Sequence, residues 1–440
     1  MAKLQWRWTD VDRQIFRLAI PNILTNMSVP LISSVDTALM GGLSVRHLGA
    51  MGLGAMIFNF LYWNFGFLRM GTTGMTAQAY GAKKENAVFA NLLRGLITAF
   101  LLAALLIVFQ KPLIQLALYL LRVPEDLKEL TSVYFSIRIF AAPASLGLYV
   151  VLGWYFGRQN ARFPMVLTII INVVNVFLSY YFVQYREWSI QGVAWGTVAA
   201  QYLGLLIGLS VIFYNHHRAL FRGWRVFDWK WSGFRDFMVI NRDIFIRTLF
   251  LSTAFAFFNA QSAEMGTYIL AANVIFLQFL NWMSYGIDGF AFATESVVGK
   301  YLGEQNSKKL DQTLRRVFLW GLVVAGVYML IYGMGGRQLF ALFTDEYIPN
   351  EFKQEILLWV VLTPLLAFWS YIWDGVFVGM TASVAMRNSM IFAFILYIAA
   401  HYSCMHFFGL RGMFIALNVF LVGRALFQFL LFKRRGWSLK

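Results

Sequence analysis

Residues 153–157 read GWYFG and residues 375–379 read GVFVG, so both glycines of the first segment recur 222 residues later. The same offset relates two further pairs of segments, LGAM at 48–51 with LAAN at 270–273 and QAYG at 78–81 with KYLG at 300–303. A single offset that holds at three separated places predicts an internal duplication. In an apolar chain, such a duplication is typical of a transporter whose binding site lies between the two repeats.

The composition excludes a soluble globular protein, because 59% of the 440 residues are hydrophobic and only 13% are charged. Apolar runs of about twenty residues, enough for a helix to cross about 30 Å of hydrocarbon, recur along the chain. Barrel strands need only about ten residues, so the run length predicts helices. We expect twelve membrane-spanning helices, at residues 14–38, 50–75, 88–119, 131–155, 163–185, 190–214, 238–262, 268–297, 314–340, 355–379, 388–408 and 410–432.

A long polar break at 215–237 divides these spans into two sets of six. Its basic residues are interleaved with Trp and Phe, as expected for a segment in the lipid headgroup layer. We therefore expect an N-lobe at 1–214, a cytoplasmic linker at 215–237 and a C-lobe at 238–440. An even number of helices in each half makes the repeats parallel, so the predicted fold is an all-α integral membrane protein with two parallel six-helix repeats.

The net charge of +16 does not predict a nucleic-acid partner, because the basic residues are distributed by membrane side. Roughly 25 of the 37 Lys and Arg residues fall on one side of the proposed topology, the side that holds both termini, the 215–237 segment and the 300–316 loop. This asymmetry places both termini in the cytoplasm. We expect a multi-pass protein of the bacterial inner membrane, monomeric, with the lipid bilayer as its surroundings.

Motifs for enzyme or metal chemistry are missing from the sequence. The single cysteine, Cys404, lies in an apolar segment, and none of the five histidines is part of an HExxH pattern. No nucleophile elbow or phosphate-binding loop is present. The sequence therefore predicts neither an enzyme nor a bound cofactor or metal, apart from a coupling ion.

One acidic residue lies in the first predicted span among polar residues of two other spans. Asp36 costs at least about 2.5–3.5 kcal/mol to insert into hydrocarbon, so its presence calls for a function. Asn172, Asn175 and Ser179 are spaced so that they share one helix face, and Thr197 follows the start of the next span at similar depth. These partners let the carboxyl group exist in both protonation states, which suits a proton-loading site. The alternative is that Asp36 only holds three helices together.

Two prolines interrupt the same span. Pro21 and Pro30 each remove a backbone hydrogen bond and permit a bend, so this helix is a candidate hinge that carries a titratable group. The alternative is that both are ordinary membrane-helix prolines.

The second half has no counterpart of Asp36, because the offset leads to Phe258. Its charges lie nearer the cytoplasm and include Arg247, Asp288 and Asp374, which we expect to form one neutralised cluster with a titratable proton. A static salt bridge between helices is the alternative. Glu295, near a helix end, is expected to be an interfacial anchor.

Eight stretches resemble the multidrug and toxic compound extrusion (MATE) family, and its DinF-like branch in particular. They are VDTALMG (35–41), AQAYGA (77–82), RIFAAPASL (138–146), GRQNARFP (157–164), INVVNVFLS (171–179), RDIFIRTLFL (242–251), YGIDGFAFATES (285–296) and DGVFVGMTASVAMRNSM (374–390). They cover nearly the whole chain in order. The resemblance implies a V-shaped fold of two six-helix lobes, with the substrate path between the lobes and export driven by entry of protons or sodium ions.

The resemblance also assigns residues. It implies that Asp36 is the carboxylate of the N-lobe site, with Asn175 and Thr197 as partners, and that Asp374 corresponds to the helix 10 acid of a cation site. Many relatives carry a second acid in helix 5 where this chain has Ser179. A helix 7 glutamate of the NorM-like branch also has no match in 238–262. Both departures count against sodium binding.

The leading hypothesis from sequence is a proton-coupled exporter of amphipathic, cationic or polyaromatic small molecules that uses Asp36. A sodium-coupled multidrug antiporter is one alternative. A flippase for a lipid-linked intermediate is another, and it predicts a groove lined by Arg69, Arg138 and Arg424, which are otherwise expected to be structural. A membrane receptor or scaffold is disfavoured by the duplicated lobes and the absence of a sizeable soluble domain. The substrate and the stoichiometry do not follow from the sequence.

Overall fold

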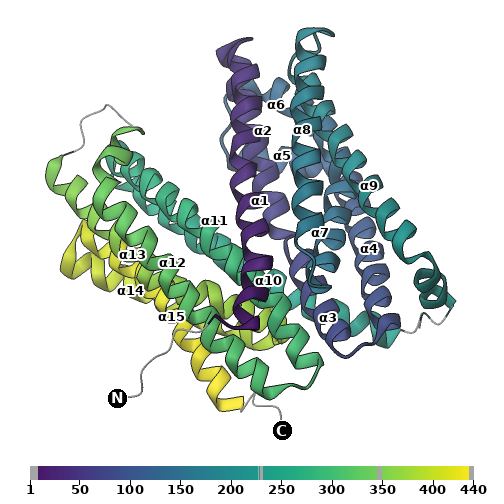
Figure 1. Cartoon of the computed structure of the whole chain (residues 1–440). Coiled ribbons are helices and arrows are strands. Elements are labelled where there is room, and N and C mark those ends of the chain that lie inside the picture. The colour runs from purple at the N-terminus through teal and green to yellow at the C-terminus, as the bar shows by residue number, and fades with distance from the viewer. Residues whose placement is uncertain (1–7, 226, 228–230, 344–348, 436–440) are drawn as a thin grey trace, which may run out of the picture. The chain divides into compact units, whose positions relative to one another are not determined.

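The computed structural model describes residues 8–225, 227, 231–343 and 349–435, and these residues form helices with no strand among them (Figure 1). Eleven of the described helical segments are long and apolar enough to cross a membrane. Helix α1, 32 residues long, covers the remaining expected span at 14–38. The prediction of an all-α membrane fold with duplicated helices is confirmed.

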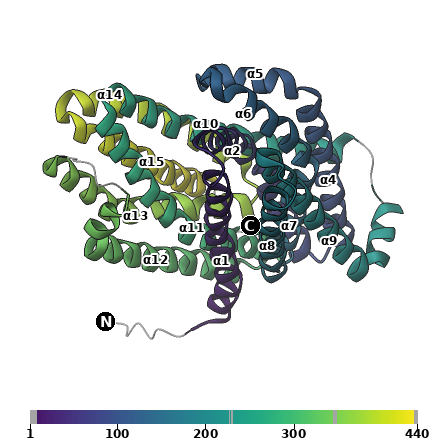
Figure 2. The ribbon, with the colours of Figure 1, turned by 90° about the horizontal axis from the view of Figure 1, so that it is seen from above.

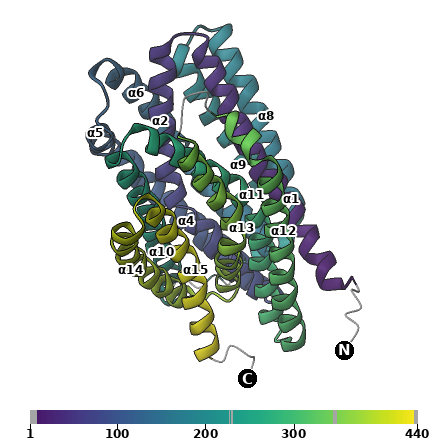
Figure 3. The ribbon, with the colours of Figure 1, turned by 90° about the vertical axis from the view of Figure 1, so that its left-hand side faces the viewer.

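The helices of the first half are α1 (Asp10–Gly41), α2 (Val45–Asn64), α3 (Phe67–Gly81), α4 (Glu85–Val108), α5 (Gln110–Leu120), α6 (Glu125–Arg138), the 3-10 turn η1 (Ile139–Ala141), α7 (Ala142–Gly157), α8 (Arg162–Gln184) and α9 (Ser189–Arg225). Those of the second half are α10 (Trp231–Glu264), α11 (Thr267–Gly303), α12 (Ser307–Ala341), α13 (Asn350–Gly379), α14 (Ser383–Phe408) and α15 (Leu410–Arg435). Helices α8 and α9 lie side by side, as do α14 and α15 (Figure 2). Helices α11, α12 and α13 pack together in the same way (Figure 3).

Three expected spans differ from the observed helices. The span at 50–75 is broken between α2 and α3 around Gly66, and the span at 131–155 is broken by η1 ahead of Pro143. The span at 88–119 ends at Val108, after which α5 begins with Pro112 in its first turn. Glycine permits the backbone to leave the helix, and proline is tolerated only where no helical N–H is needed. Hydropathy alone does not reveal such breaks.

The two halves repeat the same backbone contacts. A Cβ atom at Gly153 would lie 2.5 Å from the carbonyl oxygen of Arg69, and one at Gly375 would collide in the same way with the carbonyl oxygen of Ala291. Arg69 and Ala291 are themselves separated by the offset of 222 residues. Helices α3 and α7 in one half, and α11 and α13 in the other, thus approach so closely that only glycine fits between them.

The turns repeat as well. Lys83 and Gln159 have φ angles of 55° and 62°, and their counterparts Gln305 and Thr381 have φ angles of 54° and 51°. Each of these four non-glycine residues adopts the sparsely populated left-handed conformation. Because strained turns recur at the same offset as the glycine contacts, the duplication predicted from three short segments extends through the backbone of both halves.

Contacts divide the chain into two compact units. The N-unit comprises residues 24–239, and the C-unit comprises residues 1–23 and 240–440. The beginning of α1 therefore packs with the second half of the chain, whereas Asp36, later in the same helix, belongs to the N-unit. The segment 215–237 is largely helical, because α9 continues to Arg225 with a kink at His216 and α10 begins at Trp231.

Buried Asp12 attaches the start of α1 to α12 within the C-unit. Its carboxylate accepts hydrogen bonds from the Thr9 backbone N–H and the Trp320 Nε1–H, each at 2.8 Å, and Arg316 lies 3.7 Å away. Burial by itself raises the pKa of Asp12, but the hydrogen bonds from Thr9 and Trp320 and the charge of Arg316 outweigh it, so the pKa lies below its usual value. Asp12 therefore accepts these hydrogen bonds as an ionised carboxylate.

We expect Asp12→Asn to destabilise the protein at neutral pH by about 1.5–3 kcal/mol, the usual value of hydrogen bonds to a charged group. Because the folded pKa is depressed, this stabilisation is fully present above the unfolded pKa of about 3.9 and disappears as the pH falls through the folded pKa. Thermal unfolding of the purified protein in detergent at pH 7 and at pH 3 measures the effect. A difference between wild type and variant that is equally large at both pH values would contradict the assignment of a charged Asp12.

Candidate functional site

The N-unit brings four of the five predicted polar residues together. Asp36 of α1 faces the hydroxyl group of Ser179 on α8. One turn earlier on α8, the Asn175 Nδ2–H donates to Thr197 Oγ1 on α9 at 3.0 Å. The Thr197 hydroxyl in turn donates to the carbonyl oxygen of Val193 at 2.9 Å, which leaves its lone pairs free to accept from Asn175. The amide group of Asn175 is thereby oriented by α9.

The fifth residue, Asn172, contacts α1 at Ser28 rather than at Asp36. Its Nδ2–H donates to Ser28 Oγ at 3.1 Å, and the Ser28 hydroxyl donates to the carbonyl oxygen of Thr25. Asn172 therefore connects α8 to α1 two turns before Asp36 and does not contact the carboxyl group. Of the predicted hinge prolines, Pro21 is buried within α1, whereas the side chain of Pro30 lies outside the described residues. The backbone is helical at both.

Arg138, at the end of α6, completes the charge distribution around Asp36. Its guanidinium group lies over the rings of Phe58 and Tyr62, 5.2 and 5.5 Å from their centres, and its charge acts on the Asp36 carboxylate and on Tyr134. The sequence marked Arg138 as a cation inside the membrane, but we expected it to be structural. Its position beside Asp36 depends on the packing of α6 and has no local sequence signal. We call Asp36, Arg138, Asn175, Ser179, Thr197 and Tyr62 the Asp36 cluster.

The Asp36 cluster contains an unusual number of polar atoms without partners. Within the described part of the chain, the buried atoms without a hydrogen bond include Asp36 Oδ1, Arg138 Nη1, Asn175 Oδ1, Ser179 Oγ and Tyr62 Oη. Each such atom costs about 1–3 kcal/mol, and native proteins satisfy nearly all of them. Asp36 and Arg138 are only half-buried. The cluster is therefore an incompletely satisfied polar site that can accept a proton, an ion or a polar ligand.

The C-unit contains a second charge cluster, and its charges are paired. Asp374 Oδ2 accepts from the guanidinium groups of both Arg247 and Arg424, and Asp374 Oδ1 accepts from Gln428 Nε2 at 2.7 Å. Asp288 acts electrostatically on both arginines. The three predicted residues Arg247, Asp288 and Asp374 thus lie together, with Arg424 and Gln428 in addition.

This second cluster is closed. The exposed fractions of Arg247, Arg424 and Asp374 are 7%, 2% and 7%. Both oxygens of Asp374 are already occupied by fixed donors, so the carboxylate offers no free oxygen to a sodium ion. Glu295 lies in the same field and is 2% exposed. The expectation that Glu295 is an interfacial anchor is wrong, because α11 continues past it to Gly303 and its side chain is buried inside the C-unit.

A further buried ion pair was not predicted. Asp243 on α10 is fully buried and accepts from Arg387 Nη1 at 2.8 Å and from the Ser383 hydroxyl at 3.1 Å, both on α14. Arg242 also lies 3.0 Å from this carboxylate. The pair joins the cytoplasmic ends expected for α10 and α14. Two adjacent residues of opposite charge, at 242–243, are typical of an exposed helix end. The sequence therefore gives no sign that Asp243 is buried.

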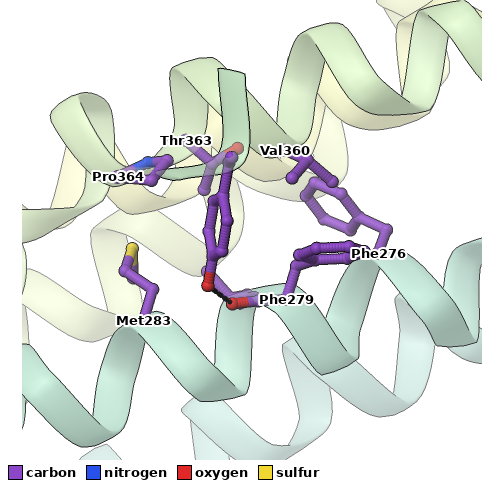
Figure 4. Close-up of a pocket in the computed structure, with 8 residues that line it drawn as sticks. Phe276, Phe279, Met283, Val360, Thr363 and Pro364 are labelled. Atoms are coloured by element: carbon purple, nitrogen blue, oxygen red, sulfur yellow. Dashed lines mark hydrogen bonds between the residues drawn. The ribbon is translucent and has the colours of Figure 1, made fainter. Parts of the chain in front are cut away.

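An apolar cavity between α11, α12 and α13 is too small to hold a substrate (Figure 4). Its volume of about 10 Å³ is near the minimum for one water molecule. Tyr332 lines it, and the Tyr332 hydroxyl donates to the carbonyl oxygen of Phe279 at 2.8 Å. The cavity lies at Pro364, which supplies no N–H to the helix. We attribute it to imperfect packing around this proline. No group of His, Cys, Asp and Glu suited to a metal ion occurs in the described residues.

A duplicated bundle of apolar helices long enough to cross a membrane, with a half-buried charge site in one half, is typical of a membrane transporter. The family model described as MatE matches the chain twice, at residues 21–181 and 244–403, in agreement with the offset between the repeats. The chain belongs to the MatE family, as the resemblance in sequence implied, and it is therefore a multi-pass transporter rather than an enzyme.

Individual relatives support the same assignment. The chain is 35% identical to the DNA damage-inducible protein F of Escherichia coli K12, over 95% of this chain and 91% of that protein. It is 23% identical to the multidrug resistance protein NorM of Vibrio cholerae, over 81% and 79% of the two chains. Among solved structures, it is similar in fold to a MOP superfamily transporter from Pyrococcus furiosus, with a TM-score of 0.86 and 20% identity over 98% of this chain and 97% of that one.

We expect the two charge clusters to respond differently to loss of their acid. Asp374→Asn leaves two buried arginines without a counter-ion and is expected to destabilise the C-unit by about 3–5 kcal/mol. Asp36→Asn is the matched control, and it is expected to change stability by less than about 1 kcal/mol because Asp36 Oδ1 makes no hydrogen bond. Thermal unfolding of both variants in detergent tests this difference. An Asp374→Asn variant as stable as wild type but inactive would instead assign Asp374 a direct role in transport.

Proposed function

We propose that the protein is a proton-coupled antiporter of the bacterial inner membrane, with Asp36 as its coupling carboxylate. It exports amphipathic small molecules, cationic or polyaromatic, as a monomer with both termini in the cytoplasm. The observation that carries the proposal is the contrast between the two acids. Asp36 is half-buried with an unpartnered oxygen, whereas both oxygens of Asp374 are bound by fixed side chains. The multidrug resistance protein named among the relatives supports this class of substrate.

The Asp36 cluster offers partners for both protonation states of the acid. As a carboxylate, Asp36 can bind a cationic substrate and is balanced at longer range by Arg138. As a carboxylic acid, it becomes a hydrogen-bond donor, and the unpartnered Ser179 Oγ and Asn175 Oδ1 are acceptors in the same unit. A proton and a cationic substrate thus compete for one group. This competition couples the two fluxes only if the two ligands favour different conformations of the transporter.

Helix α1 is the element best placed to transmit the change. Its start is fixed in the C-unit by Asp12, and Asp36 lies in its later part, within the N-unit. Pro21 and Pro30 lie between these two points and weaken the hydrogen-bond ladder of the helix. In our proposal, protonation of Asp36 lets it donate a hydrogen bond to an acceptor on α8, and α1 bends at the prolines.

Sodium coupling has less support. A sodium ion is bound by several oxygen ligands, and carboxylates are the strongest of these. The Asp36 cluster contains one carboxylate, because Ser179 stands where a second acid would be needed. In the C-unit, Arg247 and Arg424 occupy the positions around Asp374 that a cation would take. The flippase alternative also loses support, since Arg424 is 2% exposed and bound to Asp374.

Transport in proteoliposomes tests the coupling ion. We expect a pH gradient to drive uptake of ethidium by the wild-type protein, a sodium gradient at constant pH to drive none, and Asp36→Asn to lower the pH-driven rate at least about tenfold by removing the only carboxyl group of the cluster. Arg158→Gln, at an arginine that contacts His216 elsewhere in the N-unit, is the control and should transport normally. Sodium-driven uptake that survives in Asp36→Asn would refute the proposal.

A further inference from the structure

We propose that Asp36 and Arg138 together form a two-point site for zwitterionic substrates, in which Asp36 binds the cationic group and Arg138 binds a carboxylate on the same aromatic molecule. The inference rests on the proposed function and narrows its substrate class. It assigns a ligand-binding role to Arg138, which no carboxylate of the described chain neutralises at contact distance.

The surroundings of Arg138 differ from those of three buried or half-buried arginines of the C-unit. Arg247 and Arg424 share Asp374, and Arg387 binds Asp243, so each of these has a carboxylate at hydrogen-bond distance. Among the described residues, Arg138 has no acidic side chain within salt-bridge distance, and its buried Nη1 has no acceptor. Its nearest acid, Asp36, acts on it only at longer range. A membrane-embedded cation without a direct counter-ion is costly, and a bound anion would remove that cost.

The aromatic residues around Arg138 fix its orientation but leave its buried Nη1 without an acceptor. The guanidinium plane is held over Phe58 and Tyr62, an interaction that contributes about 0.5–2 kcal/mol but accepts no N–H. Tyr62 is 8% exposed, and its hydroxyl has no partner within the described structure. Ser145, 7% exposed on α7, likewise has an unpartnered hydroxyl that faces Tyr62. These hydroxyl groups can donate to the same carboxylate as Arg138.

Charge balance favours a zwitterion over a simple cation. The ionised Asp36 and the charged Arg138 sum to zero, so a substrate that carries only a positive charge neutralises the acid and leaves the guanidinium group uncompensated. A substrate with one ammonium-type group and one carboxylate compensates both. The charged or titratable groups that face Asp36 are Arg138 and Tyr134, both on α6, so no other acid replaces Asp36 in this balance. Proton entry still competes with the cationic end, and coupling is retained.

Two dyes that differ by one methyl ester test the inference. Rhodamine 110 carries a free carboxylate beside its cationic ring system, and rhodamine 123 is the methyl ester of the same molecule and is only cationic. We expect Arg138→Gln to weaken binding of rhodamine 110 about tenfold and to change binding of rhodamine 123 less than about twofold, since one charge-assisted pair is lost for the first dye alone. Arg138→Lys keeps the charge and should restore part of the loss.

Fluorescence polarisation in detergent gives the Kd of each dye, and pH-driven uptake in proteoliposomes gives the transport rate. Arg158→Gln removes an arginine that is also stacked on an aromatic ring, Trp154, and should change neither dye. Equal losses for both dyes in Arg138→Gln would identify a structural role and overturn the inference, as would no loss for rhodamine 110. The proposed function fails separately, if Asp36→Asn retains pH-driven uptake of rhodamine 123.

Discussion

The cost of an ionised side chain in hydrocarbon governs this structure, because every charge left among the membrane-spanning helices must be neutralised or used. In the C-unit, buried carboxylates are neutralised by direct partners. Asp374 is bound by two arginines and a glutamine, and Asp243 is bound by Arg387 and Ser383. In the N-unit, Arg138 instead acts on Asp36 electrostatically, but the two side chains form no ion pair at contact distance. The first arrangement holds helices together, and the second leaves polar groups to which, in our proposal, a proton or a substrate binds.

The two halves of the chain share backbone features but not charged residues. Glycine contacts and left-handed turns recur at one offset, so both halves share a helical scaffold. The charged residues do not recur, since Asp36 corresponds to Phe258 and Asp374 corresponds to Leu152. Each half therefore carries its own polar cluster on the same frame. A site that occurs in only one of two repeats is easier to assign to a single ion than one that occurs in both.

Much of the architecture followed from sequence because its signals are local. Span length and the repeated glycines predicted the helices and their duplication, and the spacing of Asn175 and Ser179 predicted one face directed at Asp36. Other features depend on neighbours far along the chain. The stacking of Arg138 on Phe58, the bond from Gln428 to Asp374 and the burial of Asp243 against α14 leave no periodic pattern. The functional roles of these residues remain predictions.

The attachment of α1 to α12 also sets the order in which the protein matures. Asp12 is synthesised 308 positions before its partner Trp320. At about 5–20 residues per second, roughly 15–60 s of synthesis separate the two, and the N-unit is complete well before then. During this interval Asp12 has its local partner Thr9 but lacks the hydrogen bond from Trp320. The C-unit of this transporter is therefore complete only when the newly made α12 binds the first turn of α1.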